Sequence, residues 1–250
     1  MKKDLYNFAI RMGDTSWILS HRLCELCSFG PFLEEDLAMT NVGLDHIGQA
    51  EEWLNYACEL SDEDVDADFL AYRRKEKEYR NVQLVEYPND DFAYVITRQF
   101  YLDVYNYLLY TKLTQSKDAT FAAIAKKSLK EVKYHLRHSS NWMVRLGDGT
   151  EESHERVQNA VDDLWFYTGD LFVMPESEQN LAKEGIIPNL VDLEADWEKM
   201  VLEVFEKAGI NKPSYEVLAS GSFDGQHTEY LGFMLCEMQY LPNKYQDAKW

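Results

Sequence analysis

Two segments of the chain carry a carboxylate where a helix could hold iron, but the residue three positions later cannot complete the site. They are Asp45-His46-Ile47-Gly48 and Glu131-Val132-Lys133-Tyr134. In di-iron carboxylate bundles two helices each supply Glu-x-x-His, because residues i and i+3 share one helical face and can grip the same ion. Gly48 has no side chain, and Tyr134 is a poor substitute for an imidazole nitrogen. The pattern therefore predicts the frame of a di-iron site that has lost its histidines.

The spacing of two further acids supports this frame. Asp14 lies about 30 residues before Asp45, and Asp103 lies a similar distance before Glu131. An antiparallel helix pair with a short loop needs roughly 30 residues to return to the same height, at about 1.5 Å of rise per residue. If these acids converge without iron, protonation or a nearby cation must relieve their repulsion. The candidate cations are Arg11 and Arg98. Because acids are frequent in this chain, ordinary surface carboxylates remain the alternative.

Histidines offer a smaller alternative site. His135 lies four residues after Glu131 and three before His138, so one helix presents three donors. Zinc or iron would be held there only if another helix added a ligand, for which Asp45 and His46 are the candidates. Histidines that only make hydrogen bonds are the simpler interpretation, and we predict no metal ligands in this chain.

Composition and charge point to a folded, acidic, soluble protein. Hydrophobic residues make up 46% of the 250 and aromatic residues 14%, which argues against disorder. The net charge of −19 would repel phosphate backbones, so nucleic acid is not an expected partner. The N-terminus lacks the apolar run of a signal peptide, and no apolar run approaches the roughly 20 residues that span a bilayer. We expect a cytoplasmic protein with no membrane partner.

Helical periodicity recurs along the chain, and strand alternation does not. Four long helices are expected at residues 4–28, from Pro31 to about residue 60, from residue 90 onward, and at 119–146. Shorter helices follow the same signals at residues 66–75, 152–172, 190–208 and 225–241. We expect one all-α domain over residues 1–250, with a four-helix bundle at about 4–147 and additional C-terminal helices at about 150–245.

The helix expected at 119–146 can be divided into faces at about 100° per residue. Lys126, Lys130 and Lys133 fall on one face, which should meet solvent. Glu131 and His135 fall on a different flank. A carboxylate there would be partly buried, which is costly unless it is paired, protonated or bound to metal.

Several blocks of sequence resemble one known family. They are Arg-Met-Gly-Asp at 11–14, Leu-Ser-His-Arg-Leu at 19–23, Asp-Leu-Ala-Met-Thr-Asn-Val-Gly-Leu-Asp-His-Ile-Gly-Gln-Ala at 36–50, Lys-Glu-Val-Lys-Tyr-His-Leu-Arg at 130–137, Gly-Gln-His-Thr-Glu-Tyr-Leu-Gly at 225–232 and Glu-Met-Gln-Tyr-Leu at 237–241. Together they resemble the C subunits of bacterial phenylacetyl-CoA epoxygenase complexes. The blocks span nearly the whole chain in order, so their joint occurrence is more specific than any one of them.

The resemblance implies a ferritin-like four-helix bundle without iron. In this family the homologous A subunit holds the di-iron centre, and the complex converts the ring of phenylacetyl-CoA to an epoxide. The C subunit supports its catalytic homologue and helps to hold the CoA thioester. The expected partners are therefore phenylacetyl-CoA, the catalytic A subunit, the B subunit of the complex and a reductase, with no cofactor bound by this chain. Whether the chain also associates with itself stays open.

The resemblance also places the substrate contacts in two segments. These contain Glu78, Tyr79, Arg80, Asn81, Gln179, Asn180 and Leu181. The first segment ends a cluster of five cations in nine residues, at 73–81 of an otherwise acidic chain. Arginine forks and lysine charges suit the phosphates of CoA, although a solvated helix end with internal ion pairs would give the same pattern. The second segment is expected to be irregular, between Pro175 and Gly185.

Two other functions remain open at this point. The chain could be a di-iron or mixed-metal oxidase in its own right, or it could be a stand-alone acyl-CoA binding module. The residues available to the oxidase are Asp14, Asp45, Asp103, Glu131 and His135.

Overall fold

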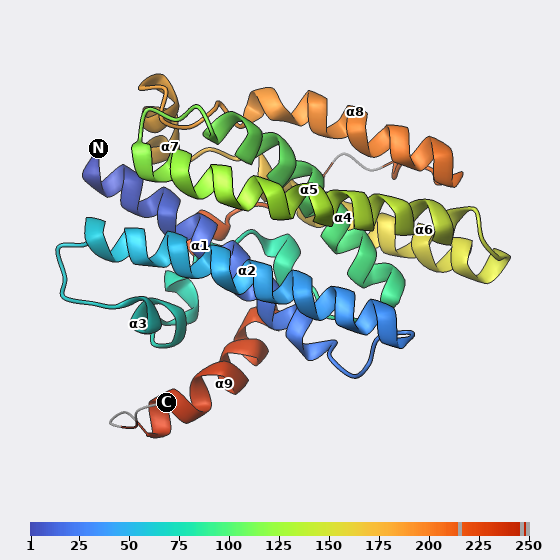
Figure 1. Ribbon diagram of the computed structural model, residues 1–250, viewed down its shortest axis with the longest axis horizontal. Coiled ribbons are helices and arrows are strands. Elements are labelled where there is room, and N and C mark those ends of the chain that lie inside the picture. The colour runs from blue at the N-terminus through green and yellow to red at the C-terminus, as the bar shows by residue number, and fades with distance from the viewer. Residues whose placement is uncertain (215–216, 246–247, 249–250) are drawn as a thin grey trace.

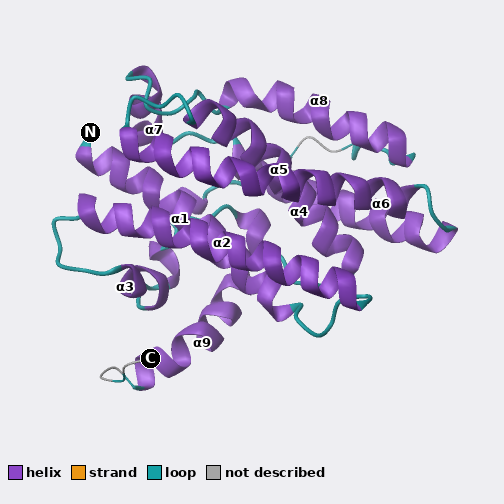
Figure 2. Ribbon diagram, in the orientation of Figure 1, coloured by secondary structure: helices purple, strands orange, loops and turns teal. Residues whose placement is uncertain are grey.

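The protein is a bundle of four long helices with further helices packed around it (Figure 1). The computed structural model describes residues 1–214, 217–245 and 248, and in this part every regular element is a helix (Figure 2). The bundle helices are α1 (Lys2–Glu25), α2 (Leu33–Leu60), α4 (Phe92–Leu113) and α5 (Ala119–Gly147). The expected all-α architecture is confirmed.

The bundle consists of two helix pairs, α1 with α2 and α4 with α5. Helix α4 is the central element, with Phe100, Tyr101 and Leu102 in succession fully buried. Three successive residues point to three sides of a helix, so α4 is enclosed by other elements over most of its circumference. Helix α5 is amphipathic instead, and its lysine-bearing face is exposed as expected. The second pair therefore places α5 at the surface with one flank turned toward the bundle interior.

Side-chain caps define where several helices begin. Asp91 accepts hydrogen bonds from the first free N–H groups of α4, and Asp118 does the same for α5. Thr150 caps α6 (Glu151–Trp165). Such caps satisfy N–H groups that have no partner inside the helix. They fix the start of each helix and so the height of its inward-facing residues.

The remaining helices surround the bundle. Helix α8 (Val191–Ala208) contacts α4 and α5, and α7 (Glu176–Lys183) contacts α1. The short α3 (Ala67–Tyr72) contacts α2, and α9 (Glu229–Lys244) projects from the bundle (Figure 1). Four 3-10 turns complete the order of the described elements: η1 (Glu76–Glu78), η2 (Gln83–Glu86), η3 (Phe166–Leu171) and η4 (Ser222–Asp224). Residues 215–216 of the expected C-terminal part lie outside the described residues. Within the described part of the chain, we find no helix that could cross a membrane.

Two sequence expectations are wrong in detail. The helix expected at 152–172 ends at Trp165 and continues as the 3-10 turn η3. The segment expected to be irregular near residue 180 is helix α7. Pro175 precedes it, Glu176 and Glu178 place negative charge in its first turn, and Gly185 follows it with a left-handed φ of 71°. These are ordinary start and stop signals of a helix.

Candidate metal centre and substrate-facing segments

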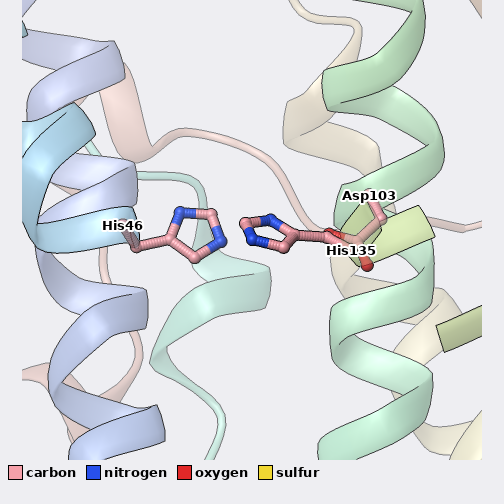
Figure 3. Close-up of side chains that lie close together, drawn as sticks. All are labelled: His46, Asp103 and His135. Carbon is pink, nitrogen blue, oxygen red and sulfur yellow. The ribbon is translucent and has the colours of Figure 1, made fainter. Parts of the chain in front are cut away.

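Three potential metal ligands meet in the bundle interior, one from each of three helices. They are His46 of α2, Asp103 of α4 and His135 of α5, and one donor atom from each lies within 4.8 Å of the others (Figure 3). All three are buried, at no more than 1% exposed. The two imidazoles face each other with ring centroids 5.3 Å apart. The three side chains come together because α2 packs against the α4–α5 pair at this level of the bundle.

His46 is neutral and lacks hydrogen-bond partners. Burial lowers its pKa well below the usual value, and the neighbouring His135 lowers it further. Neither ring nitrogen of His46 has a partner among the described residues. Buried polar atoms are normally satisfied, so such a group indicates an unseen water or ligand. A neutral imidazole with a free nitrogen is also the form that binds a metal.

Asp103 is held in place by two hydrogen bonds. Gln99 donates to one carboxylate oxygen at 2.6 Å, and the Ser139 hydroxyl donates to the other at 2.7 Å. Burial raises the pKa of Asp103 to about 6, against the opposing influence of His135 and these two donors. A metal would have to compete with both donors for the carboxylate.

The other acids of the expected site lie at its edge. Asp45 is 37% exposed, and its carboxylate lies 2.9 Å from His135 Nε2. Glu131 is partly buried, as expected, and accepts a hydrogen bond from Gln49 at 2.9 Å. Burial raises its pKa, Gln49 lowers it, and the Asp45 charge raises it. His138 turns away to Glu35, at 2.7 Å, and takes no part in the cluster.

The interpretation of Tyr134 as an inward position that has lost its histidine is wrong. Tyr134 is 41% exposed, and the Arg137 guanidinium lies over its ring. The inward position on this turn is His135, four residues after Glu131 rather than three. At Gly48 a Cβ would meet nothing within 4 Å, so no neighbour fills the space of the missing side chain. The interior histidines are therefore His46 and His135, which the smaller alternative site included, and residues 48 and 134 do not contribute.

Asp14 does not join the cluster. Its carboxylate pairs with the buried guanidinium of Arg74, including a bond of 3.0 Å from Nη1, and accepts the Arg80 backbone N–H at 2.8 Å. The cations expected to neutralise the acids have other partners. Arg11 pairs with Glu178 of α7, and Arg98 donates to Tyr87 O and Asn89 Oδ1. Arg74 reaches Asp14 from just after α3, 60 residues along the chain, and the sequence carried no signal of this pairing.

These donors do not fit a di-iron centre. Such a centre needs a carboxylate from each of two helices and Glu-x-x-His from each of the other two. In the described part of the chain, Asp14 is bound by Arg74, and neither i+3 position carries a histidine. His46, Asp103 and His135 lie together in the described interior, and three is the number of protein ligands in many single-zinc sites.

The first predicted substrate segment is half accessible. Glu78 and Arg80 line a surface cavity of about 660 Å³ together with Lys2, Lys3 and Arg74. The Arg80 guanidinium donates to Lys77 O and Tyr79 O, both at 2.7 Å. The side chains of two other predicted contacts are enclosed. Tyr79 donates to Ala71 O, and Asn81 donates to the buried Glu86.

In the second predicted segment, too, some side chains are accessible and others are buried. Gln179 is exposed, donates to Met174 O and lines another surface cavity, whereas Leu181 is completely buried. Asn180 lies between them on α7 and is partly exposed. Enclosed residues shape a segment without facing a ligand, so Tyr79, Asn81 and Leu181 act as supports in this conformation. All seven residues stay predictions as substrate contacts.

A four-helix bundle with facing histidines and carboxylates in its interior is the architecture of ferritin-like proteins. The chain belongs to the family described as phenylacetic acid catabolic protein, whose model matches residues 1–250. It is 43% identical over 243 residues to the C subunit of 1,2-phenylacetyl-CoA epoxidase from Escherichia coli (strain K12). The match covers 97% of this chain and 98% of that relative. The expected family and ferritin-like fold class are confirmed.

Proposed function

We propose that this chain is a non-catalytic, accessory subunit of a multicomponent monooxygenase that epoxidises the ring of phenylacetyl-CoA in aerobic phenylacetate degradation. The observation that carries the non-catalytic role is the pairing of Asp14 with Arg74, which removes one carboxylate from the iron-binding set. The name of the E. coli relative supports the complex and the substrate. The proposed partners are the catalytic A subunit, the B subunit of the complex and a reductase.

In this proposal oxygen is activated at the di-iron centre of the catalytic partner. This chain supports that partner and contributes to binding of the CoA substrate. Its interior is filled by interlocked side chains such as Asp103 with Gln99 and Ser139. A bundle fixed in this way gives the catalytic partner a rigid surface to pack against. Rigid supports keep a reacting group in place, and small misplacements are costly for catalysis.

The contribution to substrate binding comes from the cavity beside Glu78. Its lining contains Arg80, Lys2 and Lys3 as cations beside the acids Asp62, Glu63 and Glu78. Lys2 is paired with Asp62, so Arg80 and Lys3 are the cations that we propose for the substrate. Phosphate groups of CoA are well matched by arginine forks and lysine charges. The cavity is open to solvent on one side. We infer that the catalytic partner covers this open side and places the phenylacetyl group beside its di-iron centre.

Reconstitution tests this function. Phenylacetyl-CoA oxidation is measured with the catalytic partner, the B subunit of the complex and the reductase, with and without this chain. We expect little turnover without the chain, restored turnover with it, and none from the chain without its catalytic partner. Equal turnover in the presence and absence of the chain would refute the accessory role.

A metal-dependent oxidase remains the second candidate, because the His46 nitrogens have no hydrogen-bond partner among the described residues and lie near Asp103 and His135. The chain alone would then bind a stoichiometric metal and consume oxygen with substrate. A stand-alone acyl-CoA binding module would instead bind phenylacetyl-CoA tightly without any partner protein. Metal analysis and a binding titration of the isolated chain distinguish these two from the accessory role.

A further inference from the structure

Four polar atoms at the interior cluster are buried without a hydrogen-bond partner among the described residues. They are both ring nitrogens of His46, Nδ1 of His135 and the amide oxygen of Gln99, whose amide nitrogen donates to Asp103. Protein interiors satisfy nearly all buried polar atoms, so several unsatisfied atoms at one place indicate a group that binds there. The two imidazoles face each other across this place (Figure 3).

His135 is oriented as metal-binding histidines are. An ionised carboxylate only accepts hydrogen bonds, so the His135 Nε2 atom that lies 2.9 Å from Asp45 Oδ2 carries a proton. In the neutral imidazole the lone pair is then on Nδ1, the atom that has no partner among the described residues. Histidines that bind metals almost always donate their second nitrogen to a carboxylate, a carbonyl or water in this way. Asp45 therefore holds His135 with a free donor atom in the interior.

Asp103 can bind a metal while both of its hydrogen bonds persist. Gln99 donates to Oδ1 and Ser139 donates to Oδ2, so each carboxylate oxygen accepts one bond. Each oxygen has two lone pairs, and the second can point to an ion. Ligating carboxylates are commonly held by such hydrogen bonds. The two donors that compete for this carboxylate can therefore also fix it beside a metal.

The set of donors suits zinc. Two imidazoles and one carboxylate form a known three-ligand zinc set, in which water is the fourth ligand. Donors that bind one zinc at about 2.0–2.1 Å lie roughly 3.4 Å apart in a tetrahedron. The donors of His46, Asp103 and His135 lie within 4.8 Å of one another, so small side-chain rotations bring them into range. At a given site zinc also binds more tightly than ferrous iron.

We propose that His46, Asp103 and His135 bind a single zinc ion that joins the two helix pairs of the bundle. Helix α2 supplies one ligand from the first pair, and α4 and α5 supply the other two from the second pair. Zinc has no redox chemistry, so the ion would support the fold and would not activate oxygen. The zinc site goes beyond the proposed function and does not depend on it. The chain would then have metal ligands of its own, in contrast to the prediction from its sequence.

The test is a titration of zinc into the full-length chain after a chelator has removed bound metal. The unmodified chain should bind one zinc and unfold at a higher temperature in its presence, because the ion binds only the folded state. Losing a residue that merely supports a ligand typically costs about 10- to 100-fold in metal affinity. His46→Gln removes a ligand itself, so we expect at least about 100-fold weaker binding. Asp45→Ala removes only the support of His135 and should weaken binding by about 10- to 100-fold.

His138→Gln is the matched control, because His138 lies on α5 beside His135 but is paired with Glu35 outside the cluster. This variant should bind zinc like the unmodified chain. Circular dichroism before zinc is added verifies that each variant is folded. Asp45 is 37% exposed, so Asp45→Ala keeps the test decisive if His46→Gln does not fold.

The outcomes that overturn the zinc site are specific. The site is refuted if the unmodified chain binds no zinc, or if the His46 and Asp45 variants bind zinc as tightly as the His138 control does. One ferrous iron per chain, bound in preference to zinc and lost in His46→Gln, would assign the same residues to iron and overturn the choice of metal. The accessory role is measured separately by reconstitution with the catalytic partner, so failure of the zinc site leaves that role untouched.

Discussion

At the scale of single residues, the interior of the bundle is governed by the cost of burying charge. Asp103 is completely buried, and its carboxylate accepts one hydrogen bond from Gln99 and one from Ser139. No cation pairs with it among the described residues. His46, opposite, is neutral. The cluster therefore carries ionisable groups whose charged forms are made unfavourable by burial.

Asp103 should make the stability of the chain depend on pH. Its pKa in the folded chain is raised to about 6 from 3.8, so the folded state binds a proton more tightly than the unfolded state. Stability from this group is present at low pH and is lost as pH rises from about 4 to about 6. Asp103→Asn removes the effect. The free energy of unfolding of the variant, relative to that of the unmodified chain, should rise by on the order of 1 kcal/mol between about pH 5 and about pH 7.5. Urea unfolding measures it.

Asp36→Asn is the control for burial. It makes the same chemical change at a carboxylate that is only partly buried, in the first turn of α2. Its difference from the unmodified chain should vary little over the same pH range. A pH-independent difference for Asp103→Asn would show that this carboxylate has an ordinary pKa.

Arg80 is the residue by which the substrate contact is best tested. Its guanidinium lines the cavity beside Glu78, and a charge-assisted contact is worth roughly 1.5–3 kcal/mol. Arg80→Ala should therefore weaken phenylacetyl-CoA binding to the assembled complex by on the order of tenfold or more. Lys77→Ala is the matched control, because Lys77 is exposed and not among the residues lining that cavity. Unchanged affinity for Arg80→Ala would show that this guanidinium does not contact the substrate.

The ligand positions could be predicted from the sequence only in part. Asp45, Asp103 and Glu131 were found because helical spacing places acids at one height. His135 and His46 were named only as candidates of the smaller alternative site, because spacing alone does not show which side chains point inward. The direction of each depends on how its helix is rotated, and one residue changes the direction by about 100°. The pairing of Arg74 with Asp14 depends on the path of the chain after α3, for which spacing along α1 and α2 gives no information.

At the scale of elements, the predicted substrate segments are held against α1 by buried ion pairs. Asp14 binds Arg74 and the Arg80 backbone, and one turn earlier Arg11 binds Glu178 of α7. Both segments are therefore fixed to α1 through Arg11 and Asp14. The long helices were predictable because 3.6-residue periodicity, caps and Gly or Pro breaks agree over many residues. The short α7 and the 3-10 turns were not, because their signals span only a few residues each.

The Arg11–Glu178 pair should hold α7 in place. Both side chains are almost fully buried, and their charged atoms are 2.6 Å apart. Glu178→Ala leaves a buried guanidinium without its counter-ion, which typically costs about 3–5 kcal/mol. Because Arg11 also donates to Asp170 O, we expect about 3 kcal/mol in urea unfolding. The double variant Arg11→Met with Glu178→Leu should recover most of that loss, since apolar residues of similar size can replace a buried pair.

A double variant as unstable as Glu178→Ala would show that packing of α7, and not the uncompensated charge, accounts for the loss. The position of α7 can be followed separately through Gln179, which lies one residue after Glu178 and lines the second cavity. If α7 is displaced, phenylacetyl-CoA binding to the assembled complex should weaken in Glu178→Ala and return in the double variant.

At the scale of the whole molecule, the chain keeps the bundle architecture and distributes its proposed functions away from the centre. The interior cluster is enclosed, the cavity beside Glu78 lies at the N-terminal end of α1, and α9 extends beyond the bundle (Figure 1). Family and fold class were accessible from sequence blocks that recur in order over nearly the full length. The direction of α9 was not, because a helix that packs along a bundle and one that projects from it share the same periodicity.

The iron content of the isolated chain tests this arrangement as a whole. Protein expressed with excess iron and purified without its catalytic partner should contain far less than one iron per chain, because Arg74 binds Asp14 and only three donors meet in the described interior. Elemental analysis and an optical spectrum decide it, with the catalytic partner prepared in parallel as the positive control. His46→Gln is the matched variant: metal that it removes was bound at the interior cluster, whereas metal that it leaves unchanged is bound elsewhere. About two irons per chain, lost in this variant, would contradict the accessory role and establish a di-iron site built on His46 and His135.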